Sequence, residues 1–509
     1  MTSPQRRYAA LVGLAATSCG LGAGHLVAGV VGPSTSPAIA VGSAAIDLTP
    51  LWLKDWATST LGTADKPVLI VGVLVVVLCL GALAGILQSR NRSGAWLLAG
   101  LAGIAALAAA TRPSGGQLAV LPSSVAALVG IVGLRFVPTD GSNPAGRERA
   151  AYAGSADRRT VVAAGLLTGA GAGAAYLGTR LGAPIGATGQ SLTLPAPSAP
   201  LPALPAGLGA STPGLTPLRT PVADFYRIDT AVIIPRIDVS AWRLRIDGDV
   251  DHPYEVTFDE LLRMPMIEAD ITLNCVSNPV GGDYIGSTRW LGVRTRDVLA
   301  RAGVRDTADQ ILSTSHDGMT ISTPVAALQD DRGALLAIAM DGKPLTPTHG
   351  FPVRMITPGL YGYVGATKWL THLTATTYAK DQAYWSTRGW AEQAEVKTQS
   401  RIDVPRDGAS VPAGSELAIA GVAWSQARQG ISGVEVRVDD GAWIAADLGP
   451  DVGGHYWRQW RATWTPSASG QHVITARATD GTGAIQTTTI AEPAPDGASG
   501  LHSIRVRVR

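Results

Sequence analysis

Residues 272–282 read TLNCVSNPVGG and pass from a strand-like segment into a loop rich in Gly and Asn. Loops that leave strand ends in this way often carry binding or catalytic residues. The stretch contains Cys275, whereas the other two cysteines, Cys19 and Cys79, lie in long apolar runs near the N-terminus. An odd cysteine cannot form a structural disulfide within its own region, so Cys275 is either a small buried side chain or a functional thiolate.

Basic residues follow downstream in Gly-rich company. The segments are HGFPVR at 349–354, TPGLYGY at 357–363 and TKWL at 367–370. His349, Arg354 and Lys368 offer the fixed donors that an anion such as a phosphate requires, and glycines leave backbone N–H groups accessible. The sequence therefore predicts an anion-binding site in this region.

The chain around these motifs has a mixed α/β pattern from about residue 220 to 396. Strands are predicted at 242–246 and 311–315, and helices at 258–263 and 296–302. After about 397, short segments with period-2 alternation predict a β-sandwich of about 110 residues. Its expected strands are 416–420, 434–438, 457–464, 472–478 and 504–508.

The N-terminal part of the chain has a different composition. Only 16% of all residues are charged, 46% are hydrophobic and the mean hydropathy is +0.18, which indicates that part of the chain lies in lipid. Long apolar runs, each near the roughly 20 residues that a bilayer requires, predict five transmembrane helices at 8–32, 68–88, 94–111, 118–137 and 160–178. The net charge of +2 gives no electrostatic reason to expect nucleic-acid binding.

Basic residues alternate between the connections, which predicts the topology. One set of connections holds Arg6, Arg7, Arg90, Arg92, Arg135, Arg147, Arg149, Arg158 and Arg159, whereas the other holds only Lys54, Lys66 and Arg112. The positive-inside rule then places the N-terminus in the cytoplasm of a multi-pass protein of the cell membrane and everything after about residue 180 outside the cytoplasm. His25 is the single histidine of the apolar region, so no bis-histidine haem is expected there.

Two further features connect the apolar region to the rest of the chain. Arg158-Arg159 before a mild, Gly-rich apolar stretch has the pattern of an internal twin-arginine export signal, although two arginines also satisfy the positive-inside rule alone. Residues 181–219 are rich in Pro, Ala, Leu, Ser and Gly and predict a semi-extended tether.

The segments Leu273-Asn274-Cys275, RWLG at 289–292, HGFPVR at 349–354 and Lys368-Trp369 together resemble the sulfite oxidase family of molybdopterin-dependent oxidoreductases. The resemblance covers residues 220–509, and the terminal part is similar to the family's immunoglobulin-like dimerisation domain. It implies a molybdenum–molybdopterin cofactor with Cys275 as the thiolate ligand of the metal and with Asn274 beside it. It further implies that His349, Arg354 and Lys368 hold the pterin, chiefly its phosphate.

The resemblance also implies residues for the substrate. Arg227 is similar to the family arginine that reaches the anionic substrate, and Arg289 is expected to line the site. The family's active-site tyrosine aligns with Trp390, whose indole cannot accept a hydrogen bond as a phenol does, so Tyr384 is a candidate source of a hydroxyl. This departure puts sulfite itself in doubt as the substrate.

The predicted architecture is multi-domain. It comprises an all-α bundle of five transmembrane helices (1–180), a Pro/Ala-rich linker (181–219), an α+β molybdopterin domain (220–396) and an all-β immunoglobulin-like sandwich (397–509). The expected activity is two-electron oxygen-atom transfer, in the oxidase or reductase direction, on a small oxyanion or sulfur compound. No haem is expected in the chain, so electrons would pass to a separate extracytoplasmic carrier such as a cytochrome, and the last domain would pair two chains.

Two other interpretations stay open from the sequence. The part of the chain outside the cytoplasm could be a binding or adhesion module with an unoccupied cofactor pocket, although four intact candidate ligands argue against this. Cys275 could also be the nucleophile of a hydrolase with His316 or His349 as its base, but no orienting partner is recognisable.

Overall fold

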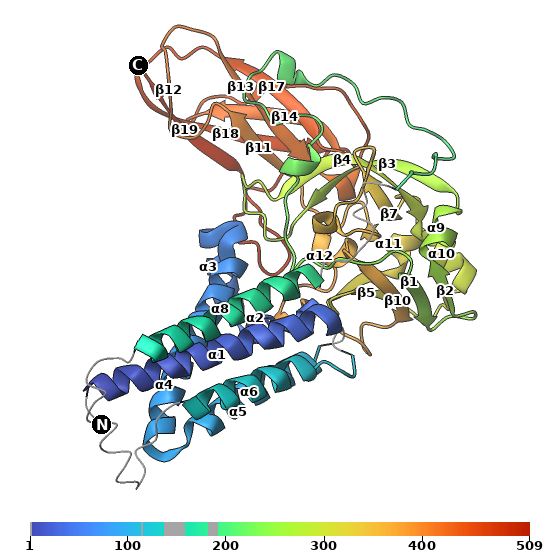
Figure 1. The fold of residues 1–509 in the computed structure, drawn as a ribbon. Helices are drawn as coiled ribbons and strands as arrows, with labels where there is room; N and C mark the ends of the chain where they lie inside the picture. The colour runs from blue at the N-terminus through green and yellow to red at the C-terminus, as the bar shows by residue number, and fades with distance from the viewer. Residues whose placement is uncertain (1–2, 113–115, 137–157, 182–191) are drawn as a thin grey trace, which may run out of the picture. The chain divides into compact units, whose positions relative to one another are not determined.

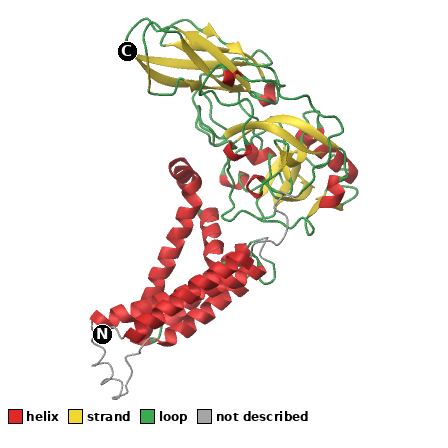
Figure 2. Ribbon diagram, turned by 45° about the horizontal axis from the view of Figure 1, so that its top comes forward, coloured by secondary structure: helices red, strands yellow, loops and turns green. Residues whose placement is uncertain are grey.

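The computed structural model describes residues 3–112, 116–136, 158–181 and 192–509. The chain divides into two compact units, the first comprising Met1–Gly186 with Thr230–Arg236 and the second comprising Ala187–Asp229 with Ile237–Arg509. Helices make up the first unit, and strands dominate the second (Figure 2).

The first unit contains seven α-helices among its described residues. They are α1 (Ser3–Val31), α2 (Pro37–Leu48), α3 (Leu51–Leu61), α4 (Asp65–Asn91), α5 (Gly94–Ala110), α6 (Leu121–Gly133) and α8 (Arg158–Leu181). Each of the five predicted apolar segments contains a helix: α1, α4, α5, α6 and α8. Within the described ranges, three helices are long and apolar enough to cross a membrane: Arg6–Val31, Asp65–Asn91 and Val162–Leu181.

The structure confirms a helical N-terminal region but does not confirm a bundle of five spanning helices. The apolar helices α5 and α6 have 17 and 13 residues, which is shorter than the roughly 20 residues of a full span. In addition, the segment between the first two predicted spans contains the helices α2 and α3. The proposed cytoplasmic arginines Arg147 and Arg149 lie outside the described residues.

Glycines allow the helices of the first unit to approach closely, as the Gly/Ala-rich sequence predicts. A Cβ atom on Gly22 of α1 would collide with the carbonyl oxygen of Gly171 in α8, and a Cβ on Gly29 would collide with that of Gly178. α1 and α8 therefore lie side by side along much of their length (Figure 1). His25 is hydrogen-bonded through Nδ1 to Ser36 Oγ at 2.9 Å, as suits a packed side chain.

Two sheets, one mixed and one antiparallel, form the middle of the second unit. The first has the order β2 (Tyr254–Thr257), β1 (Arg243–Gly248), β10 (Leu370–Thr376), β5 (Gln310–Ser315) and β6 (Thr320–Pro324). The second has the order β3 (Met266–Asn274), β4 (Ile285–Arg294), β7 (Leu335–Met340) and β8 (Lys343–Pro344), and β9 (Arg354–Ile356) also pairs with β7. β3 is thus an edge strand, and it leads directly to Cys275.

Short helices connect these strands. They are α9 (Phe258–Leu262), α10 (Thr295–Ala302), α11 (Val325–Gln329) and α12 (Gly362–Gly365). Helix α9 begins with a capping box: Thr257 Oγ1 accepts from the Glu260 N–H at 3.2 Å, and the Glu260 carboxylate accepts from the Thr257 N–H at 2.8 Å. The predicted helices at 258–263 and 296–302 are confirmed as α9 and α10.

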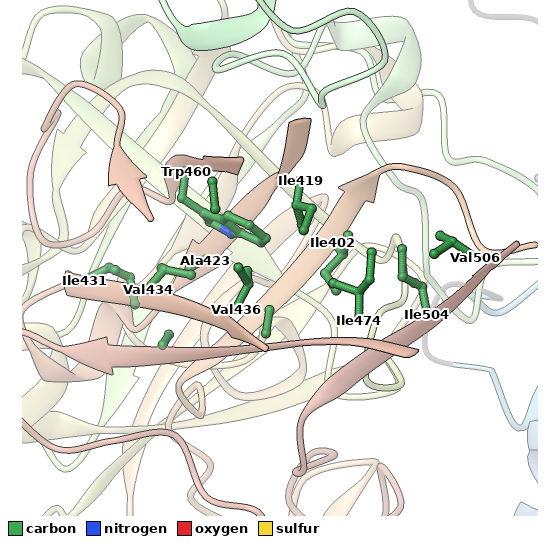
Figure 3. Packing of buried hydrophobic residues seen from close by; sticks show 13 residues of the cluster. Ile402, Ile419, Ala423, Ile431, Val434, Val436, Trp460, Ile474, Ile504 and Val506 are labelled. Carbon is green, nitrogen blue, oxygen red and sulfur yellow. The ribbon is translucent and has the colours of Figure 1, made fainter. Parts of the chain in front are cut away.

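A sandwich of two sheets, which we call the C-terminal sandwich, completes the chain. One sheet has the order β11 (Gln399–Val404), β13 (Leu417–Trp424), β17 (Arg458–Trp464) and β16 (Asp447–Leu448); the other has the order β12 (Ala409–Val411), β19 (His502–Val508), β18 (Gly470–Asp480), β14 (Ile431–Val438) and β15 (Ile444–Ala445). Trp460 and Ile419 of the first sheet pack against Val436 and Ile504 of the second, as Figure 3 shows. Alternating inward side chains therefore build the core that the sequence pattern predicts.

The described part of the predicted tether, residues 192–219, is bound to the second unit instead of extending freely. The Ser198 N–H donates to the Met266 carbonyl at 2.8 Å, and the Leu201 N–H donates to the Glu268 carboxylate at 2.8 Å. Further along, Gln459 of the C-terminal sandwich accepts from the Leu208 N–H at 2.7 Å. This part of the tether covers the start of edge strand β3, a common way to protect unpaired backbone groups.

Candidate functional site

Cys275 lies at the end of β3, at the start of a closed turn that we call the cysteine loop (residues 275–284). The Cys275 N–H donates to the Tyr284 carbonyl at 3.0 Å, and its carbonyl accepts from the Asn278 N–H at 3.1 Å. The Asn278 side chain closes the loop by accepting from the Tyr284 N–H at 2.9 Å. The thiol is therefore held by backbone contacts on both sides.

Burial controls the chemistry of this thiol. Cys275 is 8% exposed, and burial raises its pKa, although hydrogen bonds with Ser277 and the charge of Lys368 oppose that rise. A thiolate here needs a positive charge to stabilise it, because the surroundings are apolar. The neighbouring Asn274 is buried, and its side-chain oxygen has no partner among the described residues.

His349, Arg354 and Lys368 come together, as predicted, around the tight turn at Gly350. Gly350 has φ +102°, and a Cβ there would lie 3.1 Å from both Arg354 Cβ and Lys368 Cα. Only glycine adopts this conformation readily and leaves space for both neighbours. The glycine in the HGFPVR segment is therefore a packing requirement of the cationic group.

Arg354 is buried with few partners. One Nη donates to the His349 carbonyl at 3.2 Å, the guanidinium lies 5.2 Å from the Trp290 ring centre, and Nε has no partner among the described residues. Burial lowers the pKa of Arg354 to about 10. A buried guanidinium with unused donors is costly unless an anion completes its coordination.

Asp229 links two of the basic residues and was not predicted from the sequence. Its carboxylate, with a 3% exposed side chain, accepts from Lys368 Nζ at 2.6 Å and from Arg227 Nε at 2.9 Å. Burial lowers the pKa of Lys368 to about 8, although the charge of Asp229 opposes that change. Through this shared carboxylate, Arg227 belongs to the cationic group.

Arg289 does not join this group, which corrects the prediction that it lines the site. Its guanidinium binds the Asp270 carboxylate at 2.7 and 2.9 Å, and it also donates to the carbonyls of Leu201 and Pro202 in the tether. The residue pairs β4 with β3 and fixes the tether. Its neighbour Trp290 is the side chain that faces Arg354.

Trp390 and Tyr384 belong to an aromatic cluster. Trp390 is 6% exposed, and its ring centre lies 5.7 Å from that of Tyr363 and 6.2 Å from that of Trp385. Tyr384 packs edge-on against Trp385 at 5.0 Å and lies under the Arg388 guanidinium at 3.6 Å. These contacts account for both predicted residues as packed side chains.

Tyr226 is a better candidate for a hydroxyl near the thiol, and the sequence analysis missed it. Burial raises the pKa of Tyr226 well above its ordinary value, Cys275 raises it further and Arg354 lowers it. A Cβ on Gly362 would lie 3.7 Å from the Tyr226 hydroxyl and 3.7 Å from the Asn274 carbonyl. In the sequence, the one feature that could have drawn attention to Tyr226 is its position beside Arg227, and that position alone does not indicate a role.

His349 is neutral at neutral pH. Burial, followed by the charges of Arg354 and Lys368, lowers its pKa to about 4, and its Nε2 lies 3.2 Å from the Val222 carbonyl. A neutral ring that donates from Nε2 keeps Nδ1 as an acceptor.

We expect acid to weaken the fold through His349. Its folded pKa lies below the unfolded value of 6.5, so its contribution is present above pH 6.5 and is lost as the pH falls towards about 4. The loss should be roughly 2–3 kcal/mol in the free energy of unfolding. Denaturant unfolding of the parent and of His349→Gln between pH 7 and 4 measures it. Because His316, His455 and His502 also have lowered pKa values, the difference between the two profiles is the relevant quantity, and parallel profiles would contradict the expectation.

Comparison with known proteins identifies the domain types of the second unit. The oxidoreductase molybdopterin binding domain matches residues 231–385, and the bacterial Ig domain matches residues 399–476. The solved sulfane dehydrogenase SoxCD from Paracoccus pantotrophus aligns at 24% identity over 54% of this chain and 77% of that chain, with a TM-score of 0.46.

Two curated relatives show how far the similarity extends. Mitochondrial sulfite oxidase of Macaca fascicularis is 30% identical over 306 residues, which cover 51% of this chain and 55% of that protein, so the match spans about half of the relative's length. The oxidoreductase YuiH of Bacillus subtilis, of uncharacterised function, is 33% identical over 153 residues, which cover 30% of this chain and 74% of that protein. Together with the domain match, these relatives show that the chain belongs to the sulfite oxidase family of molybdopterin-dependent oxidoreductases.

Proposed function

We propose that this chain is a molybdopterin-dependent oxidoreductase that acts on a small oxyanion or sulfur compound. The observation that carries the proposal is the convergence of His349, Arg354 and Lys368 around the turn at Gly350. The charge of Lys368 also opposes the rise in the pKa of the buried Cys275 thiol. Among the described residues, no group of three or more His, Cys, Asp or Glu side chains could hold a metal ion by itself. A metal at Cys275 would therefore need its other ligands from a bound cofactor.

The residues present fit a molybdopterin cofactor. Buried polar atoms without partners in the described part of the chain include Asn274 Oδ1, Asn278 Nδ2 and Arg354 Nε, and such atoms usually mark a ligand or water. Cys275 would bind the metal, because a soft sulfur ligand suits it. His349, Arg354 and Lys368 would hold the phosphate, and Arg354 would supply two parallel donors.

The residues of this chain then have distinct tasks. The bound cofactor supplies two-electron redox chemistry coupled to oxygen-atom transfer. Arg227, whose side chain is 28% exposed, is the member of the cationic group that is accessible to an anionic substrate. Asp229 holds Arg227 and Lys368 at a fixed separation, and the buried Tyr226 offers a hydroxyl near Gly362, which also faces the Asn274 carbonyl.

We also propose that the first unit anchors the oxidoreductase in the cell membrane. Three helices of sufficient length support anchoring, and the alternation of arginines supports a cytoplasmic N-terminus with the second unit outside the cytoplasm. The same proposal includes domain boundaries at 180, 219 and 396 and five membrane passages. It also includes a twin-arginine export route through Arg158-Arg159, a cytochrome-like electron acceptor and pairing of two chains. Reporter fusions at the C-terminus test the topology, and a cytoplasmic C-terminus would contradict it.

The function is tested by metal and pterin analysis of the full chain, purified in detergent from a host that makes molybdopterin. We expect close to one molybdenum and one pterin per chain, together with reduction of an artificial electron acceptor when sulfite or another sulfur compound is supplied. A folded chain without molybdenum and pterin, beside a loaded sulfite oxidase from the same host, would contradict the proposal.

A further inference from the structure

The C-terminal sandwich is hydrogen-bonded to Thr272, three positions before Cys275. Thr272 accepts at its carbonyl from Gln426 Nε2 at 3.1 Å, and its N–H donates to the His455 carbonyl at 2.9 Å. Its hydroxyl accepts from the Trp457 N–H at 2.7 Å. The hydroxyl also shares a hydrogen bond with Ser287 of β4, but both backbone groups of Thr272 bond residues that follow β13 or precede β17 in the sandwich.

The sandwich also holds the far end of the cysteine loop. Arg401 of β11 donates from one Nη to the Gly282 carbonyl at 2.9 Å and from the other to Thr216 Oγ1 at 2.8 Å. Its Nε donates to the Asp403 carboxylate at 2.7 Å, so all three guanidinium nitrogens of Arg401 have a partner. The residue is only 8% exposed. A Cβ on Gly281, which has φ +78°, would collide with the His502 ring.

These contacts replace what a neighbouring strand would otherwise supply. β3 is the edge of its sheet, and an edge strand has unpaired backbone groups that make its end mobile unless something covers them. Here the sandwich binds on both sides of Cys275, at Thr272 and at Gly281–Gly282. The thiol therefore sits on a loop whose two ends are fixed by another part of the second unit.

We propose that the C-terminal sandwich positions the thiol of Cys275, with Arg401 and Gln426 as positioning residues. This role differs from pairing of two chains and requires only one copy. This proposal depends on the proposed function only for the identity of the group that Cys275 binds. The contacts between the sandwich and the cysteine loop are present in the chain without that group. Metal sites respond strongly to such supporting contacts, since outer partners typically change affinity or activity by about 10–100-fold.

The test compares four variants of the full chain. Arg401→Met and Gln426→Leu remove the side-chain donors but keep similar volume, and Arg401→Lys restores a charge and one donor. Arg477→Met is the matched control, because Arg477 is an arginine of β18 that binds Glu435 and lies 4.1 Å from Trp443 within the sandwich. It removes an ion pair from the same fold without touching the cysteine loop.

The first measurement uses chain made without molybdopterin. The rate of Cys275 alkylation by iodoacetamide is followed by peptide mass spectrometry, which separates this cysteine from Cys19 and Cys79. We expect Arg401→Met and Gln426→Leu to raise the rate about tenfold, Arg401→Lys to raise it less, and Arg477→Met to leave it unchanged. The second measurement is the thiolate-to-metal absorption band of the loaded chain, which should shift or weaken in the same two variants.

The outcomes separate the two proposals. If the parent carries no molybdenum, the proposed function fails, but the alkylation rates still decide whether the sandwich holds the thiol. If Arg401→Met and Gln426→Leu both match the parent in alkylation rate, the positioning role is overturned even in a loaded enzyme. Equal changes in Arg477→Met would also overturn it, because they would reflect general loosening of the sandwich.

Discussion

Replacing Cys275 with serine should abolish turnover in a chain that remains folded. Cys275 would supply the one protein ligand of the metal, and a hard hydroxyl oxygen does not replace a soft thiolate. We expect the turnover number to fall by more than about a hundredfold, since loss of a supporting contact alone typically costs about 10–100-fold. Steady-state kinetics with the best sulfur substrate found for the parent, together with molybdenum and pterin contents, measure the effect.

Cys79→Ser is the control for this substitution. Cys79 lies in α4 and is exposed in the first unit, so its loss should change neither turnover nor metal content. Retained pterin in Cys275→Ser would indicate that the cationic group holds the cofactor independently of the thiol. Turnover within a few-fold of the parent in Cys275→Ser would refute the assigned role of the cysteine.

Replacing Arg354 with methionine should have opposite effects on cofactor content and on the stability of the chain made without cofactor. The guanidinium is buried, donates to one carbonyl and leaves Nε without a partner among the described residues. An apolar side chain of similar length removes this desolvation cost, so we expect the free energy of unfolding to rise by about 1–3 kcal/mol. The same change should reduce pterin content severely, because the phosphate loses its forked donor.

Arg289→Met is the matched comparison, because Arg289 is an arginine of the same unit with full partners. Its removal leaves the Asp270 carboxylate, whose side chain is 10% exposed, without its cation. We expect this variant to be less stable than the parent and to bind as much pterin per folded chain. Thermal unfolding of the cofactor-free proteins gives the sign, and a lower midpoint for Arg354→Met than for the parent would contradict the interpretation of Arg354 as an anion ligand.

Much of the second unit could be predicted because local patterns determine its elements. The strands expected at 434–438, 457–464 and 504–508 are confirmed as β14 (Ile431–Val438), β17 (Arg458–Trp464) and β19 (His502–Val508), with ends that differ by a few residues. Along β19, buried and more exposed residues alternate, which corresponds to the period-2 alternation of apolar and polar residues in the sequence. Helix α3 was missed because Lys54, Asp55 and three Ser/Thr residues give its sequence the appearance of a polar connection.

The site was predictable only where its residues lie in short motifs. His349 and Arg354 are five positions apart, so one segment indicates both. Asp229 contacts Lys368 across 139 positions, and Trp457 contacts Thr272 across 185 positions. Such pairs depend on how the sheets assemble, and no local pattern in one sequence reports them. The contacts of the tether could not be predicted for the same reason, since its proline-rich composition does not reveal its hydrogen bonds to β3 and to Gln459.

The glycine contacts between α1 and α8 have a consequence for biosynthesis. Gly22 and Gly29 lie near the start of the chain, whereas their partners Gly171 and Gly178 lie near the end of the first unit. During translation, α1 therefore emerges long before its partner, and its glycine surface must meet lipid or a chaperone until about residue 178 has left the ribosome. The packing of α1 against α8 can therefore form only after the last helix of the first unit has been synthesised.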